Sequence, residues 1–186
     1  MCVYPIAPPP PGYESAVASF GRLLAHLTDG TLAGADHAAA ERVVHREGTE
    51  VMRQLYESWL CGRADAEPVR EVEGSDHLAR THHRSAHRTM ESLFGTVTVA
   101  RDRVGARGAA ALAPVDAVLN LSADRFSFGV RERVSREAIR GSFDATVEAV
   151  GDTTGAAVAK RQAEALVLAA AVDFDAFYQE TQLDPS

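Results

Sequence analysis

The chain has only two cysteines, Cys2 and Cys61, among its 186 residues. Two thiols cannot build a disulfide framework or a cysteine-based zinc site, so both are interpreted as free thiols. No apolar run approaches the roughly 20 residues that a bilayer crossing needs. The N-terminus has neither the positively charged segment nor the apolar core of a secretory signal. We therefore expect a cytoplasmic protein with no membrane partner.

The sequence also lacks the common catalytic signatures: it contains no GxSxG, no Walker motif, no HExxH and no GxGxxG. Neither cysteine has a nearby histidine that would mark a nucleophile. Asp173 and Asp175 are two residues apart, so on a helix they point to different sides and cannot share a metal by themselves. Nothing in the sequence indicates an enzyme or a cofactor.

Charge is present but unevenly distributed. The 19 basic and 26 acidic residues give a net charge of -7, which by itself argues against nucleic acid. Residues 1–79 and 162–186 are acidic, whereas residues 80–161 carry 13 basic against 9 acidic residues. A basic middle between acidic ends indicates either a polyanion-binding segment or internal charge complementarity, and the charges alone leave both open.

Hydrophobic periodicity predicts an α+β fold, mostly α with a small β-hairpin. The predicted helices run from Tyr13 to Gly30, from about Asp36 to Cys61 with Gly62 closing, over Phe128–Ile139, from the N-cap Ser142, and over Val158–Tyr178. The predicted organisation is a Pro-rich tail (1–12), a helical hairpin (13–62), a linker or loop (63–86), a β-hairpin and connector (87–122), a helix-turn-helix-like domain (123–180) and a tail (181–186).

Several of these helices carry an apolar stripe, and on the first it is Val17, Phe20, Leu23, Leu24 and Leu27. On the second helix Val43, Val44, Val51, Leu55 and Trp59 recur on one side, which is typical of core packing, although an exposed stripe would serve as a dimerisation face. The inward residues expected near the C-terminus are Phe143, Val147 and Val150 in one helix and Leu166, Ala169, Ala170, Phe174 and Phe177 in the next.

The densest group of potential metal ligands is His77, His82, His83 and His87. His83 and His87 have the i, i+4 spacing that binds a metal on a helix, but this segment is predicted to run from loop into strand, where that geometry is lost. Arginines between the histidines would also repel a divalent ion. His83 and His87 remain the only candidate ligands, and a solvated basic loop that contacts phosphates is the preferred interpretation.

The stretch from Ser142 to Tyr178 has the order of a helix-turn-helix: two helices joined by a short turn that contains Gly155. The second helix opens with Lys160, Arg161 and Gln162. Arginine and lysine bind guanine edges or phosphates, and glutamine can pair with adenine, so these residue types suit the first turn of a recognition helix.

Five ordered segments resemble the ISKra-type bacterial insertion-sequence transposases. Residues 87–99 (HRTMESLFGTVTV) are similar to the family's R-x-L-E-T-x-F-G-x-V-x-V-x-R segment. The other segments are residues 112–121 (LAPVDAVLNL), 140–144 (RGSFD), 154–155 with 160–164 (TG and KRQAE), and 170–178 (AAVDFDAFY). The resemblance covers about residues 76–178.

The resemblance implies an N-terminal transposase region that recognises transposon ends in double-stranded DNA. In that family an RNase H-like catalytic domain with a metal-binding carboxylate triad follows the last segment. We therefore expect a fragment that stops before this domain and has no catalytic residue, metal or other cofactor. Base contacts are expected from Lys160, Arg161 and Gln162, and backbone contacts from Arg136, Arg140, Arg84 and Arg88.

Two other functions stay open from the sequence. The chain could be an α-helical self-association or interaction protein with no nucleic-acid role, in which the hairpin of residues 13–62 forms a homodimer. It could also be an enzyme in its own right, which would need a metal at the histidine cluster.

Overall fold

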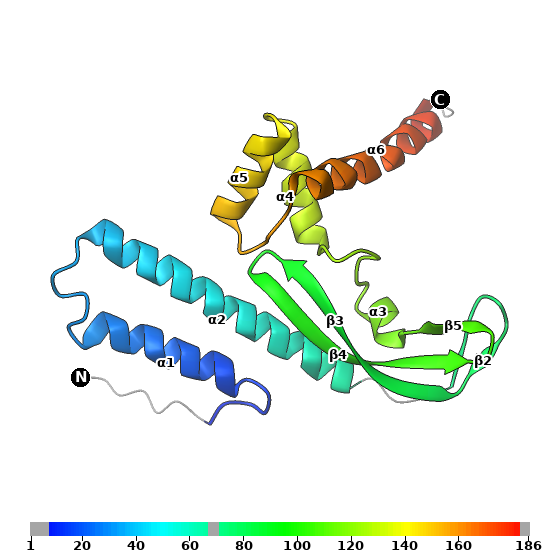
Figure 1. Ribbon diagram of the computed structural model, residues 1–186, viewed down its shortest axis with the longest axis horizontal. Helices are drawn as coiled ribbons and strands as arrows, with labels where there is room; N and C mark the ends of the chain where they lie inside the picture. Colours follow the sequence, from blue (N-terminus) through cyan, green and yellow to red (C-terminus); the bar gives the residue numbers. More distant parts are fainter. Residues whose placement is uncertain (1–7, 67–70, 183–186) are drawn as a thin grey trace. The chain divides into compact units, whose positions relative to one another are not determined.

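The computed structural model describes residues 8–66 and 71–182, with side-chain environments as far as residue 172. Residues 1–7 and 183–186 of the predicted tails, and the side chains of the expected inward residues Phe174 and Phe177, lie outside what is described. The fold class is confirmed: helices dominate and a small antiparallel sheet accompanies them (Figure 1). The chain divides into two units, residues 1–90 with 97–121, and residues 91–96 with 122–186.

The first unit begins with the predicted helical hairpin, α1 (Glu14–Thr28) and α2 (His37–Asp65), which run antiparallel side by side (Figure 1). Asp36 caps α2 by accepting a hydrogen bond from the amide of Ala39 at 2.7 Å. The prediction that Gly62 ends α2 is wrong. Leu60 is buried against the sheet with Ala64 packed beside it, and this packing stabilises a last turn beyond the glycine.

The prediction of a linker or loop over residues 63–86 is only partly correct. After α2 the described chain forms a short antiparallel pair, β1 (Val72–Glu73) with β2 (Ala79–Arg80), and then enters β3 (His82–Ser92). The first four residues of β3 are all exposed, so they carry no apolar alternation, and backbone pairing alone makes them a strand.

The β-hairpin is longer than predicted and has a third strand. β4 (Gly95–Ala106) follows β3 after a two-residue turn, and β5 (Ala109–Leu112) adds to β4, giving the order β3-β4-β5. The turn lies where Phe94 and Gly95 predicted it. In the first unit Met90, Val97 and Val99 pack with Leu60 of α2, and α3 (Pro114–Val118) follows the sheet.

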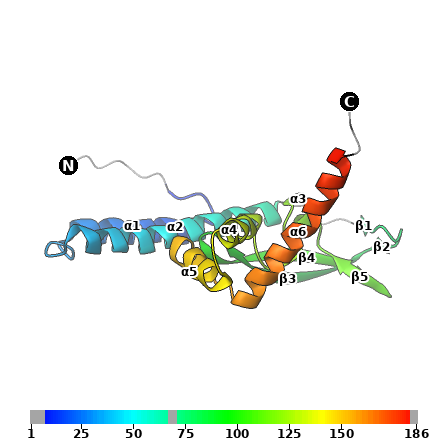
Figure 2. The same ribbon diagram turned by 90° about the horizontal axis from the view of Figure 1, so that it is seen from above.

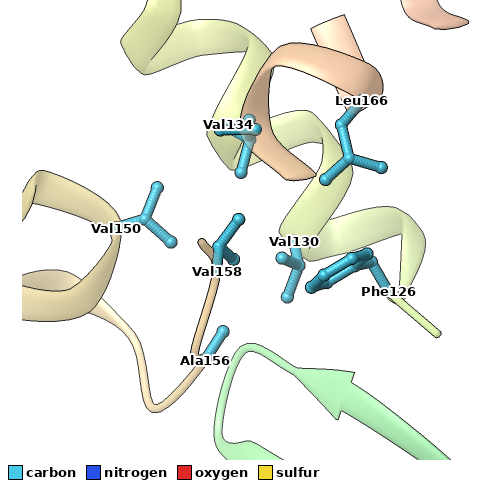
Figure 3. Packing of buried hydrophobic residues seen from close by; sticks show 8 residues of the cluster. Phe126, Val130, Val134, Val150, Ala156, Val158 and Leu166 are labelled. Carbon is cyan, nitrogen blue, oxygen red and sulfur yellow. The ribbon is translucent and has the colours of Figure 1, made fainter. Parts of the chain in front are cut away.

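The second unit is built from α4 (Phe128–Ala138), α5 (Phe143–Thr153) and α6 (Lys160–Gln182), each of which contacts the other two. Ser127 and Ser142 cap α4 and α5 with their side-chain oxygens, as predicted for Ser142. Figure 3 shows the core between these helices. Its buried members are Phe126, Val130, Val134, Val150, Ala156, Val158, Ala163 and Leu166.

Phe143 and Val147 pack against this core with Val150, as predicted. The inward stripe predicted for the last helix is only partly correct. Leu166 is buried, but Ala169 and Ala170 are exposed, because α6 continues past the helices it packs on. The helix also begins at Lys160 rather than Val158, and it reaches residue 182, beyond the predicted start of the tail.

Candidate nucleic-acid interface

The expected groove-contacting residues lie at the start of α6, in the second unit. The connection from α5 to α6 covers residues 154–159, which is longer than the three or four residues usual in a helix-turn-helix. The amide of Gly155 donates to the carbonyl of Leu93 at 2.8 Å, and the amide of Ala157 donates to the Glu91 carboxylate at 3.3 Å. The turn is therefore held by the tip of the β3–β4 hairpin.

Glu91 is the centre of this attachment. Its carboxylate is 2% exposed, forms an ion pair with Arg125 at 2.5 Å and accepts from the Thr96 hydroxyl at 3.1 Å. The Glu91 backbone also pairs with the backbone of residues 125 and 127. A buried carboxylate needs such partners, because without them its desolvation would cost several kcal/mol. Glu91 thus holds together the segment that leads into α4 and the segment that leads into α6.

Lys160 is exposed and bound to another residue of the same unit. Its ammonium lies 2.7 Å from the Asp144 carboxylate in the first turn of α5, and this hydrogen bond raises the pKa of Lys160. The contact places the first turn of α6 beside the first turn of α5. Both side chains are more than half exposed, so the pair is a surface ion pair, which contributes little to stability.

Arg161 and Gln162 differ in exposure and in hydrogen bonding. Arg161 is exposed at the second position of α6, as a groove-contacting residue must be. Gln162 is half-buried, and its side-chain oxygen accepts a hydrogen bond from the amide of Ala159 at 3.0 Å. This is the glutamine half of a capping box, so Gln162 closes the helix N-terminus instead of presenting its amide to a base.

Arg136 and Arg140 lie on the last turn of α4 and just after it. Arg136 pairs with Glu132 at 2.6 Å and Arg140 with Glu137 at 3.2 Å, and both guanidinium groups are about 70% exposed. Arg140 comes four residues before Asp144, the partner of Lys160. The structure therefore brings Arg136, Arg140 and Lys160 to the end of the three-helix unit where α4 ends and α5 and α6 begin.

Arg84 and Arg88 belong to the first unit, on β3, and are not part of this cluster. Arg84 is exposed. Arg88 is not available as a surface cation, because its side chain is only 13% exposed and binds the Asp116 carboxylate at 2.8 Å. Arg101 binds the same carboxylate oxygen. Arg88 thus links β3 to α3 through its ion pair with Asp116.

His83 and His87 lie on β3, an extended strand. Four residues along a strand span about 13 Å, which is too far for two imidazoles to share one ion. In the part of the chain that the structure describes, no three histidine, cysteine or carboxylate side chains are grouped so that they could hold a metal.

Two roles in this unit were missed by sequence reasoning. Asp144 was not among the expected contacts and is the partner of Lys160. Gln162 was expected to read a base and is a helix cap. The signal for the cap was present, because a glutamine at the third position of a helix is a common capping residue.

The chain was compared with protein-family models, with curated proteins and with solved structures, and none of them matches it. The resemblance to the ISKra-type transposases therefore stays a prediction. Among the described helices, none combines the length and the apolar character that crossing a membrane requires.

Proposed function

We propose that the chain binds double-stranded DNA through the unit of α4, α5 and α6, as the part of an ISKra-type transposase that recognises transposon ends and does not catalyse strand transfer. The observation that carries this proposal is the position of Lys160 and Arg161. They are exposed cations in the first turn of the third helix of a three-helix unit, the position that reads the major groove in helix-turn-helix proteins.

The ion pairs of this surface are compatible with the proposal. Lys160 and Arg136 are each paired with an exposed carboxylate, and such pairs contribute about 0–1 kcal/mol. Arg140 is itself exposed, although its partner Glu137 is only 11% exposed and also binds Arg133. A DNA phosphate can replace Asp144 beside Lys160 at a similarly small cost. Binding would then release counterions from the DNA, which makes the affinity strongly salt-dependent.

The proposal keeps five of the seven DNA-contacting residues expected from the sequence. Lys160 and Arg161 are proposed to enter the groove, and Arg136 and Arg140 to bind the backbone beside it. Gln162 and Arg88 are left out, because one caps α6 and the other is bound to Asp116. Arg84, which is exposed on β3, is proposed as a separate phosphate contact.

The test is fluorescence anisotropy with two labelled duplexes, one carrying the terminal inverted repeat of an ISKra-type element and one with the same bases scrambled. We expect at least about tenfold tighter binding to the inverted repeat, with affinity falling steeply as salt rises. Equal affinity for both duplexes would reject end recognition. No salt-dependent binding to either would reject DNA binding altogether.

The double variant K160A/R161A tests whether the first turn of α6 is the surface that contacts DNA. We expect it to weaken binding by about tenfold or more and to reduce the salt slope by about two, because two phosphate or base contacts are lost. The matched control is R42A/R46A, which removes two exposed cations from α2 in the other unit. If both double variants weaken binding equally, α6 is not the recognition helix.

A further inference from the structure

The helical hairpin of the first unit exposes large apolar side chains that nothing in the described chain covers. They come from both helices and are 42–48% exposed. We call them the hairpin face: Phe20, Leu24 and Leu27 of α1, and Val44, Met52, Leu55 and Trp59 of α2. A monomeric protein rarely exposes so many large apolar side chains in one contiguous area.

These side chains lie on one side of the hairpin. On α1 the buried stripe of Ala16, Ser19 and Leu23 faces α2, and at about 100° per residue the exposed stripe is centred about 75° further round the axis. On α2, Glu47 and Gln54 form hydrogen bonds to α1 and so mark the side that faces it.

On α2 the apolar stripe is turned from these contacts by about 110° in the same sense along the sequence. Because the two helices are antiparallel, rotations in the same sense bring both stripes to the same face.

The opposite face of α2 is already occupied. Tyr56, Leu60 and Ala64 pack against the sheet, and Glu57 accepts a hydrogen bond from the amide of Thr98 at 2.6 Å. Figure 1 shows α1 and α2 side by side, and Figure 2 views the same pair edge-on, as a single layer. One side of this layer carries the sheet, and the other carries the hairpin face.

We propose that the hairpin face docks on the same face of a second copy of this chain, so that two hairpins form an antiparallel four-helix bundle. Seven half-exposed large side chains supply roughly 600 Å² per copy, close to the ~800 Å² that each partner buries in a standard interface. Two-helix layers that bury their apolar stripes against each other are a common way to build such bundles.

Charge favours the antiparallel arrangement. The apolar stripe of α2 runs from Val44 to Trp59, so its midpoint lies at Met52. Glu41 and Arg63 are both exposed, on the outer edge of this face, and each is eleven residues from Met52. A two-fold axis at Met52 brings Glu41 of each copy to Arg63 of the other, whereas parallel pairing in register would bring like charges together.

The same axis also fits α1. The hydrogen bonds Ser19–Gln54 and His26–Glu47 fix the two helices against each other, so residue 52 of α2 lies level with Phe20 and Gly21 of α1. Antiparallel pairing about that point sets Leu24 beside Val17 and Ala18 of the second copy.

On α2 a Cβ at Gly48 would have no heavy atom within 4 Å, and this open position falls opposite Leu55 of the second copy. On α2 a large side chain thus meets an open position across the axis.

Sedimentation equilibrium of the full chain between about 1 and 100 µM tests the proposal. We expect a concentration-dependent dimer, and we expect Leu55→Glu to raise the dimer dissociation constant at least about 100-fold, since it buries a charge without a partner. Leu168→Glu is the matched control, because Leu168 is an exposed leucine (69%) on α6 outside the hairpin face. Circular dichroism confirms that both variants are folded.

A charge exchange tests the register with substitutions that leave the apolar face intact. Glu41→Arg and Arg63→Glu should each weaken the dimer about fivefold, and the double variant should restore it to within about twofold. A chain that is monomeric throughout, or a dimer unaffected by Leu55→Glu, overturns the proposal. Absence of rescue in the double variant overturns the antiparallel register. None of these measurements depends on DNA binding.

Discussion

Arg88 and Arg101 illustrate at the residue scale how neighbours decide the role of a charged side chain. Both guanidinium groups bind one oxygen of Asp116, and both side chains are 13% exposed. Burial lowers the pKa of Arg101, and the nearby Arg88 and Arg103 lower it further. Releasing Arg88 toward a phosphate would leave the partly buried Asp116 with fewer partners, which is costly. Sequence reasoning could not separate Arg88 from exposed Arg84, because both are arginines of the same basic segment.

Asp76 and Arg80 form a second ion pair that carries a pH dependence. The Arg80 side chain is almost fully buried, donates to the carbonyl of Ala110 at 2.8 Å and binds the Asp76 carboxylate at 2.7 Å. Hydrogen bonds from Arg80 and from the amide of Leu78 lower the pKa of Asp76 from 3.8 to about 2. The carboxylate therefore stabilises the fold above pH 4, and this stabilisation is lost as the pH falls toward 2.

We predict that Asp76→Asn lowers the thermal midpoint of unfolding at pH 6 and that the difference from the unsubstituted chain disappears as the pH approaches 2. The reason is that the folded state holds Asp76 ionised where the unfolded chain does not. Thermal melts followed by circular dichroism at intervals from pH 6 to pH 2 measure this. Asp65→Asn, at the exposed end of α2, controls for the loss of one surface charge. A difference that stays constant across this range would contradict the prediction.

At the scale of elements, helices were predicted better than strands. The periodicity and caps predict both ends of α4 and the start of α5 to within a residue, because the signals lie within one or two turns. The start of β3 was missed, because residues 82–85 are exposed and polar and become a strand only through pairing. The end of α2 was misplaced because Leu60 and Ala64 pack on residues far along the chain.

The turn between α5 and α6 requires glycine at position 155, because the backbone of Phe94 leaves no room for a Cβ atom there. A Cβ on Gly155 would lie 2.5 Å from the carbonyl carbon and oxygen of Phe94, which are backbone atoms of the hairpin tip. We predict that Gly155→Ala destabilises the second unit by about 1–3 kcal/mol, since the backbone must shift to admit the methyl group. Urea denaturation followed by helical circular dichroism gives the change in the free energy of unfolding.

Gly151→Ala is the matched control for this prediction. Gly151 lies in α5, and a Cβ there would have no heavy atom within 4 Å. Alanine is favoured over glycine inside a helix, so we expect this variant to gain about 0.5–1 kcal/mol. If both substitutions change stability in the same direction, close approach at Gly155 is not the cause.

At the scale of the whole molecule, the described chain has two hydrophobic cores that share no residue. One contains Leu60 with Met90, Val97 and Val99, and the other contains Leu166 among α4, α5 and α6. The overall charge of -7 says little about either unit, because the cations of the second unit are mostly paired with its own carboxylates.

We predict that each core stabilises its own unit. Leu60→Ala and Leu166→Ala should each cost about 2–5 kcal/mol, because each leaves a cavity in a packed cluster. Amide hydrogen exchange read by mass spectrometry should show lost protection in α2 and β4 for the first variant, and in α4 and α5 for the second. Equal loss in both units for either variant would show that they unfold together.

The fold class, the positions of most helices and the turn of the β-hairpin follow from the amino-acid sequence alone. These depend on periodicity, caps and turn residues that act over a few neighbouring positions. Tertiary contacts decide that Arg88 binds Asp116, and that Val44, Leu55 and Trp59 are exposed, against the core packing expected for them, while Leu60 is buried. The physical reason is that a side chain's partner and its exposure depend on segments that are distant in the chain, which no local pattern specifies.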